Sequence, residues 1–233
     1  MARLGTRALL AAAGALVIAG PLTVLALLVR QNSSGLHRVD QSIEESAHTF
    51  VLARPALAST LNVGSTVLHP RVMWAVVGVT AVVLWRRGRR RHAVWAVVTI
   101  AVAATVDTPL KELIRRARPV FNVPVATAPG YSFPSGHALS SMAAALIAVV
   151  LCWPATRGHP WRRAALLGAA AVLVLATGFD RVGLGVHYPS DVVGGWLIAI
   201  AVVLITTAAF HTGVTSRERD AGEPAEPSPR SDP

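Results

Sequence analysis

The most informative stretch of the sequence is polar and reads Gly130-Tyr131-Ser132-Phe133-Pro134-Ser135-Gly136-His137. A long apolar run follows it directly. A Pro-Ser-Gly turn that leads into a helix leaves the first backbone N–H groups without partners, and with the helix dipole these groups form an anion site. His137 stands at the mouth of this site and can exchange a proton near neutral pH. The stretch therefore indicates phosphate chemistry, and a helix-capping turn with an incidental histidine is the alternative.

Composition places the chain among membrane proteins. Hydrophobic residues make up 53% of its 233 residues and the mean hydropathy is +0.51, both above what soluble domains carry. The formal net charge is +10, but the arginines form short clusters between apolar runs, without the interleaved aromatic residues of a nucleic-acid-binding surface. The single cysteine, Cys152, excludes an intrachain disulfide and a metal site built on paired cysteines.

Six apolar segments are predicted to cross the membrane, because a hydrocarbon core of ~30 Å needs about 20 residues of helix. The second is the weakest, since its uncharged run extends only from 72 to 85. A secretory signal peptide is the competing interpretation of the first, but its apolar region would be only ~7–15 residues long. The predicted spans are 8–29, 70–86, 93–113, 137–153, 164–180 and 191–210.

The fold class that these spans predict is all-α, a six-helix membrane bundle in one domain over residues 1–213. A further helix is expected between the first two spans, where apolar residues recur at helical spacing and acidic residues occupy other faces. It should lie along the membrane surface and kink or end at Arg54-Pro55. The tail, 214–233, has no apolar surface to bury and is expected to be disordered. The apolar residues of the surface helix are Val39, Ile43, Ala47 and Phe50.

Charge predicts the orientation in the plasma membrane. Clusters of arginine favour the cytoplasmic side, and with six crossings all of them fall on one side together with both termini. These clusters are Arg3 with Arg7, the segments 86–91 and 157–163, and the tail. The extracytoplasmic side then receives residues 30–70, 111–137 and 180–191. The last two contain nearly every polar residue that could take part in catalysis.

Lys111 and Arg118 form the first polar group. They are two helical turns apart, so both face the same way if the third span continues to Pro119. Lys111 is the single lysine among 22 lysines and arginines, which suggests that an ammonium is needed there. Arg115 and Arg116 can be interpreted as interfacial anchors.

Arg181, His187 and Asp191 form a second polar group. A carboxylate four residues after a histidine can hold its Nδ1–H and leave Nε2 free, as in an oriented base or nucleophile. A helix-capping Asp191 beside an interfacial His187 is the alternative.

Together these motifs resemble those of the type 2 phosphatidic acid phosphatase family, whose fold is shared with vanadium haloperoxidases. The motifs are Lys111-x6-Arg118-Pro119, Pro134-Ser135-Gly136-His137 and Arg181-x5-His187-x3-Asp191. The likeness extends from about Val39 through the sixth span. It departs at Asp180, where the family usually has serine, and this carboxylate can either repel substrate phosphate or hold Arg181 in place.

The resemblance implies a role for each motif residue. His187 attacks phosphorus, Asp191 stabilises the imidazolium that develops, and His137 protonates the leaving alkoxide and later activates water. No metal or other cofactor is required. The residues that the resemblance implies for phosphate binding are Lys111, Arg118, Ser135, Gly136 and Arg181.

We therefore expect an integral-membrane phosphatase that hydrolyses a lipid phosphate or diphosphate on the extracytoplasmic face. Polyprenyl diphosphate, such as undecaprenyl diphosphate, is the favoured substrate for a small enzyme without an added recognition domain. Phosphatidylglycerol phosphate and phosphatidic acid remain alternatives. Membrane lipids are the other expected partners, and neither nucleic acid nor an obligate protein partner is expected.

Three other functions compete with this one. A phosphotransferase would use the same residues, and the sequence does not separate it from a hydrolase. A catalytically silent member that binds or transports lipid is disfavoured by the intact His137, His187 and Asp191. Haloperoxidase chemistry is disfavoured by the six apolar spans, because haloperoxidases as a class are soluble.

Overall fold

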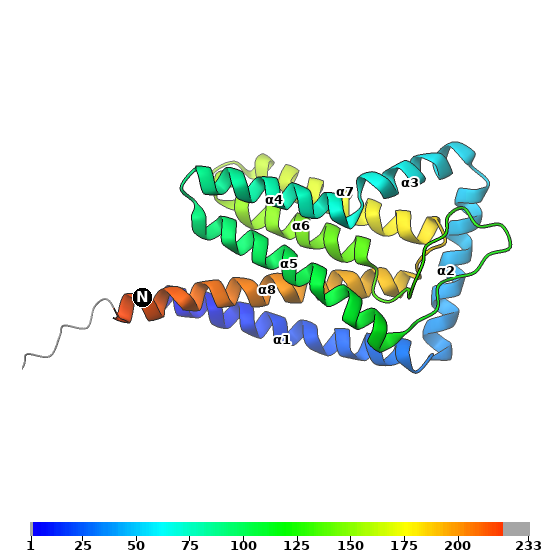
Figure 1. The fold of residues 1–233 in the computed structure, drawn as a ribbon, viewed down its shortest axis with the longest axis horizontal. Helices are drawn as coiled ribbons and strands as arrows, with labels where there is room; N and C mark the ends of the chain where they lie inside the picture. Colours follow the sequence, from blue (N-terminus) through cyan, green and yellow to red (C-terminus); the bar gives the residue numbers. More distant parts are fainter. Residues whose placement is uncertain (1, 221–233) are drawn as a thin grey trace, which may run out of the picture.

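The computed structural model describes residues 2–220, and this part of the chain is entirely helix, turn and loop. The expected all-α class is therefore confirmed. Figure 1 shows the long helices side by side, with α2 across one end of the bundle. In chain order the helices are α1 (Ala2–Arg30), α2 (Ser34–Leu52), α3 (Pro55–Val67), α4 (Pro70–Arg86), α5 (Arg90–Ile114), α6 (Gly136–Cys152), the 3₁₀ turn η1 (Trp153–Thr156), α7 (Pro160–Gly183) and α8 (Pro189–Asp220).

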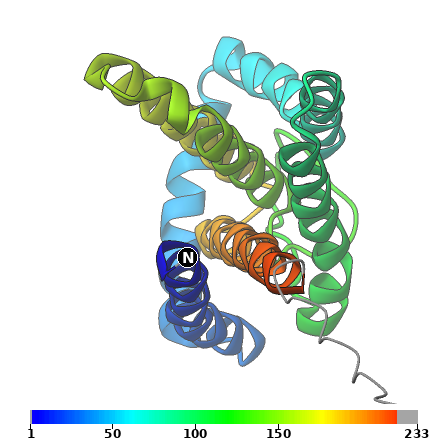
Figure 2. The same cartoon turned by 90° about the vertical axis from the view of Figure 1, so that its left-hand side faces the viewer.

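The core lies where α5, α6 and α8 meet. Small and branched residues of these helices form one buried cluster, which includes Leu139 and Ile147 of α6, Ala96 of α5 and Ala199 of α8. Figure 2 looks along the bundle and shows α8 near its centre, with α1 on one side and α5 on the other. A central α6 and α8 matter for function, because both helices begin at the end of the bundle that α2 covers.

Five helical segments within residues 2–220 are long and apolar enough to cross a membrane, and they correspond to predicted spans one and three to six. The predicted second span is α4, which passes the same test only together with α3, to which it is joined at a bend of 45°. The weakness of this span in the sequence thus has a structural counterpart, because α4 alone is too short to pass the test. α8 continues to Asp220, beyond the predicted start of the tail, and residues 221–233 lie outside the described part.

The segment in which a surface helix is expected forms two helices, with a break at the predicted position. α2 ends at Leu52 and α3 begins with Pro55. The apolar residues of α2 point outward, with Val39 56% and Ile43 49% exposed. Its acidic face points inward instead. The buried residues on that face are Asp40, Glu44 and His48.

The two ends of the bundle differ in chemistry. The turn between α4 and α5 and the connection from α6 to α7 carry the arginine clusters, and both lie at the end opposite α2 (Figure 1). The long loop 115–135, the starts of α6 and α8, and the end of α7 lie at the α2 end. The separation of basic loops from the polar motifs that the sequence predicts is therefore present.

Candidate active site

His187 and Asp191 lie where the chain turns into α8. Asp191 stands in the first turn of the helix, and its Oδ2 accepts the backbone N–H of Tyr188 at 2.9 Å. The same oxygen lies 3.4 Å from Nδ1 of His187. Both side chains are almost completely buried. The carboxylate therefore lies beside the imidazole, but at this separation Nδ1 of His187 makes no hydrogen bond within the described part of the structure.

Arg118 faces the other ring nitrogen of this histidine. Its Nη1 donates to the carbonyl of Val186 at 2.6 Å and lies 3.1 Å from Nε2 of His187. A guanidinium has only N–H donors, so Nε2 must accept and the ring proton belongs on Nδ1, toward Asp191. This tautomer leaves the lone pair of Nε2 among cationic groups.

Burial lowers the pKa of His187 to about 4. Asp191 acts in the opposite direction, while Arg118 and Lys111 lower the pKa further. The imidazole is therefore neutral near pH 7, which is the state that a nucleophile or base requires.

Arg118 reaches the site from a loop, and the expectation that it shares a helix face with Lys111 is wrong. α5 ends at Ile114, and Arg115 adopts a left-handed conformation with φ 52°. The chain then turns back toward α6. Nε of Arg118 donates to the carbonyl of Gly130 at 3.1 Å, which fixes the loop against the polar stretch.

His137 and Arg181 form a second pair of a histidine and an arginine. Nε2 of His137 lies 3.5 Å from Nη1 of Arg181 and 3.3 Å from the carbonyl of Ser65 on α3. Asp180 accepts from Nε of Arg181 at 2.8 Å and also from its Nη2. Of the two roles that the sequence allows for Asp180, the structure favours holding the arginine in place.

Ser135 and Gly136 form the turn that starts α6. Ser135 is the N-cap, and its N–H donates to the carbonyl of Asp191 at 3.0 Å, so the starts of α6 and α8 are joined. Gly195 makes this contact possible, since a Cβ there would lie 2.7 Å from the carbonyl oxygen of Ser135. The turn that starts α6 therefore lies next to the segment that carries His187 and Asp191.

Lys111 is paired within its own helix. Its Nζ lies 2.6 Å from both carboxylate oxygens of Asp107, four residues earlier. A Cβ on Gly136 would lie 3.0 Å from Oδ2 of Asp107, so this ion pair is next to the start of α6. Glycine keeps the carboxylate close to the helix N-terminus. In residues 2–220 no group of three or more histidine, cysteine or acidic side chains is arranged to hold a metal ion.

The comparison with known protein families agrees with this geometry. The family model of the PAP2 superfamily matches residues 92–214, more than half of the chain. The chain belongs to the PAP2 superfamily. This PAP2 protein is accordingly a multi-pass membrane phosphatase, a hydrolase of phosphoric monoesters or diphosphates.

Three similar proteins extend the comparison. Decaprenylphosphoryl-5-phosphoribose phosphatase of Mycobacterium tuberculosis is 30% identical over 78% of this chain and 97% of its own. Undecaprenyl-diphosphatase of Sulfolobus acidocaldarius is 29% identical over 58% of this chain and 63% of its own. The crystal structure of a transmembrane PAP2-type phosphatidylglycerolphosphate phosphatase from Bacillus subtilis shares the fold, with a TM-score of 0.68 at 20% identity over 88% of this chain and 96% of that one.

Two residues of this PAP2 site were missed by sequence reasoning. Arg116, interpreted as an interfacial anchor, lies between two buried carboxylates, those of Asp191 and Asp40. Nothing in the arginine-rich segment 115–118 distinguishes it. The sequence did contain a pattern that could have indicated Asp40. Asp40, Glu44 and His48 are spaced four residues apart and so form one polar face of α2.

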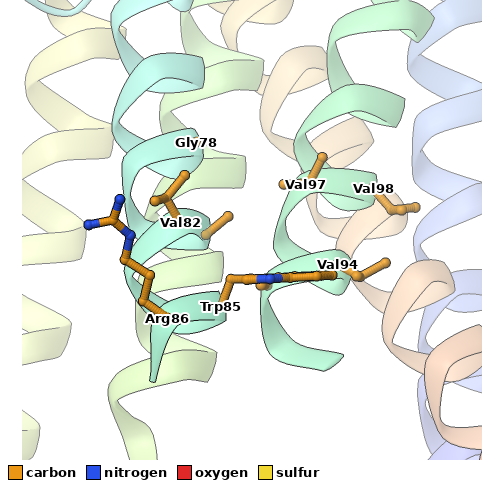
Figure 3. A pocket seen from close by; sticks show the side chains of 9 residues that line it. Gly78, Val82, Trp85, Arg86, Val94, Val97 and Val98 are labelled. Carbon is orange, nitrogen blue, oxygen red and sulfur yellow. The ribbon is translucent and has the colours of Figure 1, made fainter. Parts of the chain in front are cut away.

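An apolar hollow between α4 and α5 lies away from this PAP2 site. Figure 3 shows valine side chains and the flat ring of Trp85 lining it, with the guanidinium of Arg86 directed away. It belongs to the end of the bundle that carries the arginine cluster. With no other titratable group in its wall, it offers nothing for phosphate chemistry.

Proposed function

We propose that this PAP2 phosphatase hydrolyses a lipid phosphate or diphosphate through a phosphohistidine, without a metal ion. The observation that carries the proposal is the buried, neutral His187, whose Nε2 faces Arg118 while Asp191 lies at its other nitrogen. In the first step Nε2 attacks phosphorus and the P–O bond to the lipid breaks. His137, which must be protonated while the anionic phosphate is bound, gives its proton to the leaving alkoxide. In the second step His137 removes a proton from water, which attacks phosphorus and releases His187.

Cationic side chains supply the electrostatic stabilisation. Phosphoryl transfer spreads negative charge over the equatorial oxygens, and fixed positive groups are the main means of stabilising it. Arg118 lies beside His187 and Arg181 lies beside His137, and the N–H groups at the start of α6 complete the set. Asp180 and Asp107 hold two of the cations, Arg181 and Lys111, in fixed positions.

A polyprenyl-linked phosphate is the substrate class we favour. The similar proteins from M. tuberculosis and S. acidocaldarius are named for substrates that contain a decaprenyl and an undecaprenyl group. Phosphatidylglycerol phosphate is the alternative suggested by the B. subtilis structure.

A groove beside the site suits a lipid chain. It runs between α2, α7 and α8, has a volume of about 770 Å³, and is almost entirely apolar. Pro189 and Val182 place it next to the segment that holds His187. A prenyl or acyl chain bound there would bring its phosphate toward the site. Its largest apolar side chains are Phe50, Phe179 and Trp196.

Phosphate release from a panel of lipids tests this function. Purified protein should release phosphate from polyprenyl diphosphate faster than from phosphatidylglycerol phosphate or phosphatidic acid, and should do so in EDTA. Vanadate should inhibit, because its five-coordinate form mimics the transition state among Lys111, Arg118 and Arg181. A strict magnesium requirement would contradict the metal-free mechanism, and equal rates on all lipids would contradict the substrate preference.

The side of the membrane that holds the site is a separate prediction, and it rests on charge. In a Cys152→Ala background, Asn122→Cys in the loop 115–135 should react with an impermeant maleimide added to intact cells. Arg87→Cys in the basic turn should react only after the membrane is opened. Both positions are exposed, and Arg87 is preferred to Gly88, whose φ of 76° disfavours a side chain.

Two outcomes of the labelling would contradict the topology. The reverse pattern would place the site in the cytoplasm. Labelling of both positions from outside would show that α5, the helix between them, does not cross the membrane.

A further inference from the structure

Asp40 on α2 is bound to the start of α8. Its Oδ1 accepts the backbone N–H of Ser190 at 3.0 Å, and its Oδ2 accepts the hydroxyl of the same serine. Only 1% of Asp40 is exposed, although α2 lies at the end of the bundle. A buried carboxylate is stable only if its charge and lone pairs are satisfied. Asp40 therefore joins α2 to the turn that carries Asp191.

Arg116 satisfies the charge of Asp40 and Asp191 together. Its Nη2 donates to Oδ2 of Asp40 at 2.6 Å, and its Nη1 donates to Oδ1 of Asp191 at 2.7 Å. Burial alone would lower the pKa of Arg116, but Asp191 and Asp40 raise it above its usual value. The guanidinium also lies 4.1 Å from the ring centre of Tyr188. It is held on three sides.

The two oxygens of Asp191 consequently have different tasks. Oδ1 binds Arg116, while Oδ2 binds the N–H of Tyr188 and faces Nδ1 of His187. A carboxylate fixed at both oxygens cannot rotate away from the imidazole. Loss of Arg116 would leave Asp191 with an unpaired charge and free to turn.

We propose that Arg116 and Asp40 are positioning residues of the phosphoryl-transfer site, which hold Asp191 so that Nε2 of His187 stays aimed at phosphorus. The role rests on the proposed phosphohistidine mechanism. It makes α2 a part of the catalytic unit, since α2 supplies the outer end of the chain Asp40, Arg116, Asp191, His187. Neither residue contacts His187 itself in any hydrogen bond within the described structure.

The test compares Arg116→Ala and Asp40→Asn with Arg115→Ala. Arg115 is the matched control, because it is the neighbouring arginine, its side chain is 68% exposed, and its ion pair with Glu112 is away from the site. We expect Arg116→Ala to lower kcat by about 10–100-fold, the range for partners that orient a histidine, with KM changed by less than about threefold. Asp40→Asn should lower kcat in the same way, and Arg115→Ala should stay within about twofold of wild type.

The double variant Arg116→Ala/Asp40→Asn measures whether the effects of the two residues on kcat are coupled. If Asp40 acts through Arg116, the double variant should lose little more kcat than Arg116→Ala alone. Arg116→Lys should recover only part of the rate, since one ammonium cannot bridge two carboxylates in a planar fork. Asp40→Asn preserves shape, so it decides the question if Arg116→Ala fails to fold in detergent.

Several results would overturn the positioning role. A raised KM with unchanged kcat would mean that Arg116 binds substrate. Fully additive losses would mean that Asp40 does not act through Arg116. The proposed function fails separately, if wild-type protein releases no phosphate from any lipid phosphate. Wild-type activity with unchanged kcat in both Arg116→Ala and Asp40→Asn would refute only the positioning role.

Discussion

His187→Ala is expected to lower the rate of phosphate release by roughly 10³-fold or more while the protein remains folded. The reason is that Nε2 of His187 is the proposed attacking atom, and no second imidazole takes its place beside Arg118 in the part of the chain that the structure describes. The measurement is the initial rate on a lipid phosphate in detergent, with thermal unfolding as the check on folding. Removal of a buried ring leaves a cavity, so a moderate loss of stability is expected.

His159→Ala provides the matched control. His159 is exposed in the connection before α7, at the end of the bundle opposite the site, and its ring contacts only the carbonyl of Arg157. Its replacement should leave the rate within about twofold of wild type. If His187→Ala keeps more than about a tenth of the wild-type rate, His187 is not a covalent nucleophile.

His137→Ala should have a large effect that depends on the leaving group. A general acid contributes about 10²–10⁴-fold when the leaving group is a basic alkoxide, as in a lipid phosphate. An activated aryl phosphate needs little protonation, so its first step should be nearly unaffected. The measurement is kcat/KM for both substrates, because this ratio reports the steps up to release of the leaving group. An equal loss on both substrates would show that His137 is not the leaving-group acid.

His69→Ala separates the role of His137 from that of its neighbour. The rings of His69 and His137 meet edge to face with centres 5.3 Å apart. His69 also caps the start of α4, where its Nδ1 accepts the N–H of Arg71. We expect His69→Ala to affect both substrates alike, since its contribution is structural. A selective loss on the lipid phosphate would transfer the acid role to His69.

The meeting of the three motifs could be predicted because it follows from helix alternation. Lys111, His137 and Asp191 each stand near a helix end, and with an antiparallel bundle these ends fall on the same side. The short spacing in sequence from His187 to Asp191 was also a reliable guide, because it brings the two side chains close together where α8 begins. Local sequence patterns were therefore sufficient to predict which helix ends carry most of the candidate site.

Long-range pairing could not be predicted, because it depends on loop conformation. Because Arg115 adopts a left-handed conformation, Arg116 points to carboxylates while Arg118 points to a histidine. No sequence rule places an arginine in that conformation. Asp40 meets Ser190, which lies 150 residues away in the chain. The apolar residues of α2 suggested a membrane-facing side, but the buried acidic side opposite them carried the contacts to the site.

The break between α3 and α4 also has a local cause. Pro55 and Pro70 each start a short helix, so neither α3 nor α4 alone reaches the length of a hydrocarbon core. The apolar run in the sequence could show that α4 is short, but not that α3 continues it at an angle of 45°.

Trapping the covalent intermediate tests the central claim most directly. His137→Ala protein should be mixed with a ³²P-labelled aryl phosphate and quenched in alkali, in which phosphohistidine is stable, before peptide mapping. Label should accumulate on the peptide that contains His187, because departure of the aryl group needs no acid while hydrolysis of the intermediate needs His137 as base. The label should be absent from the double variant His137→Ala/His187→Ala. Label on another residue, or label that persists without His187, would contradict the mechanism.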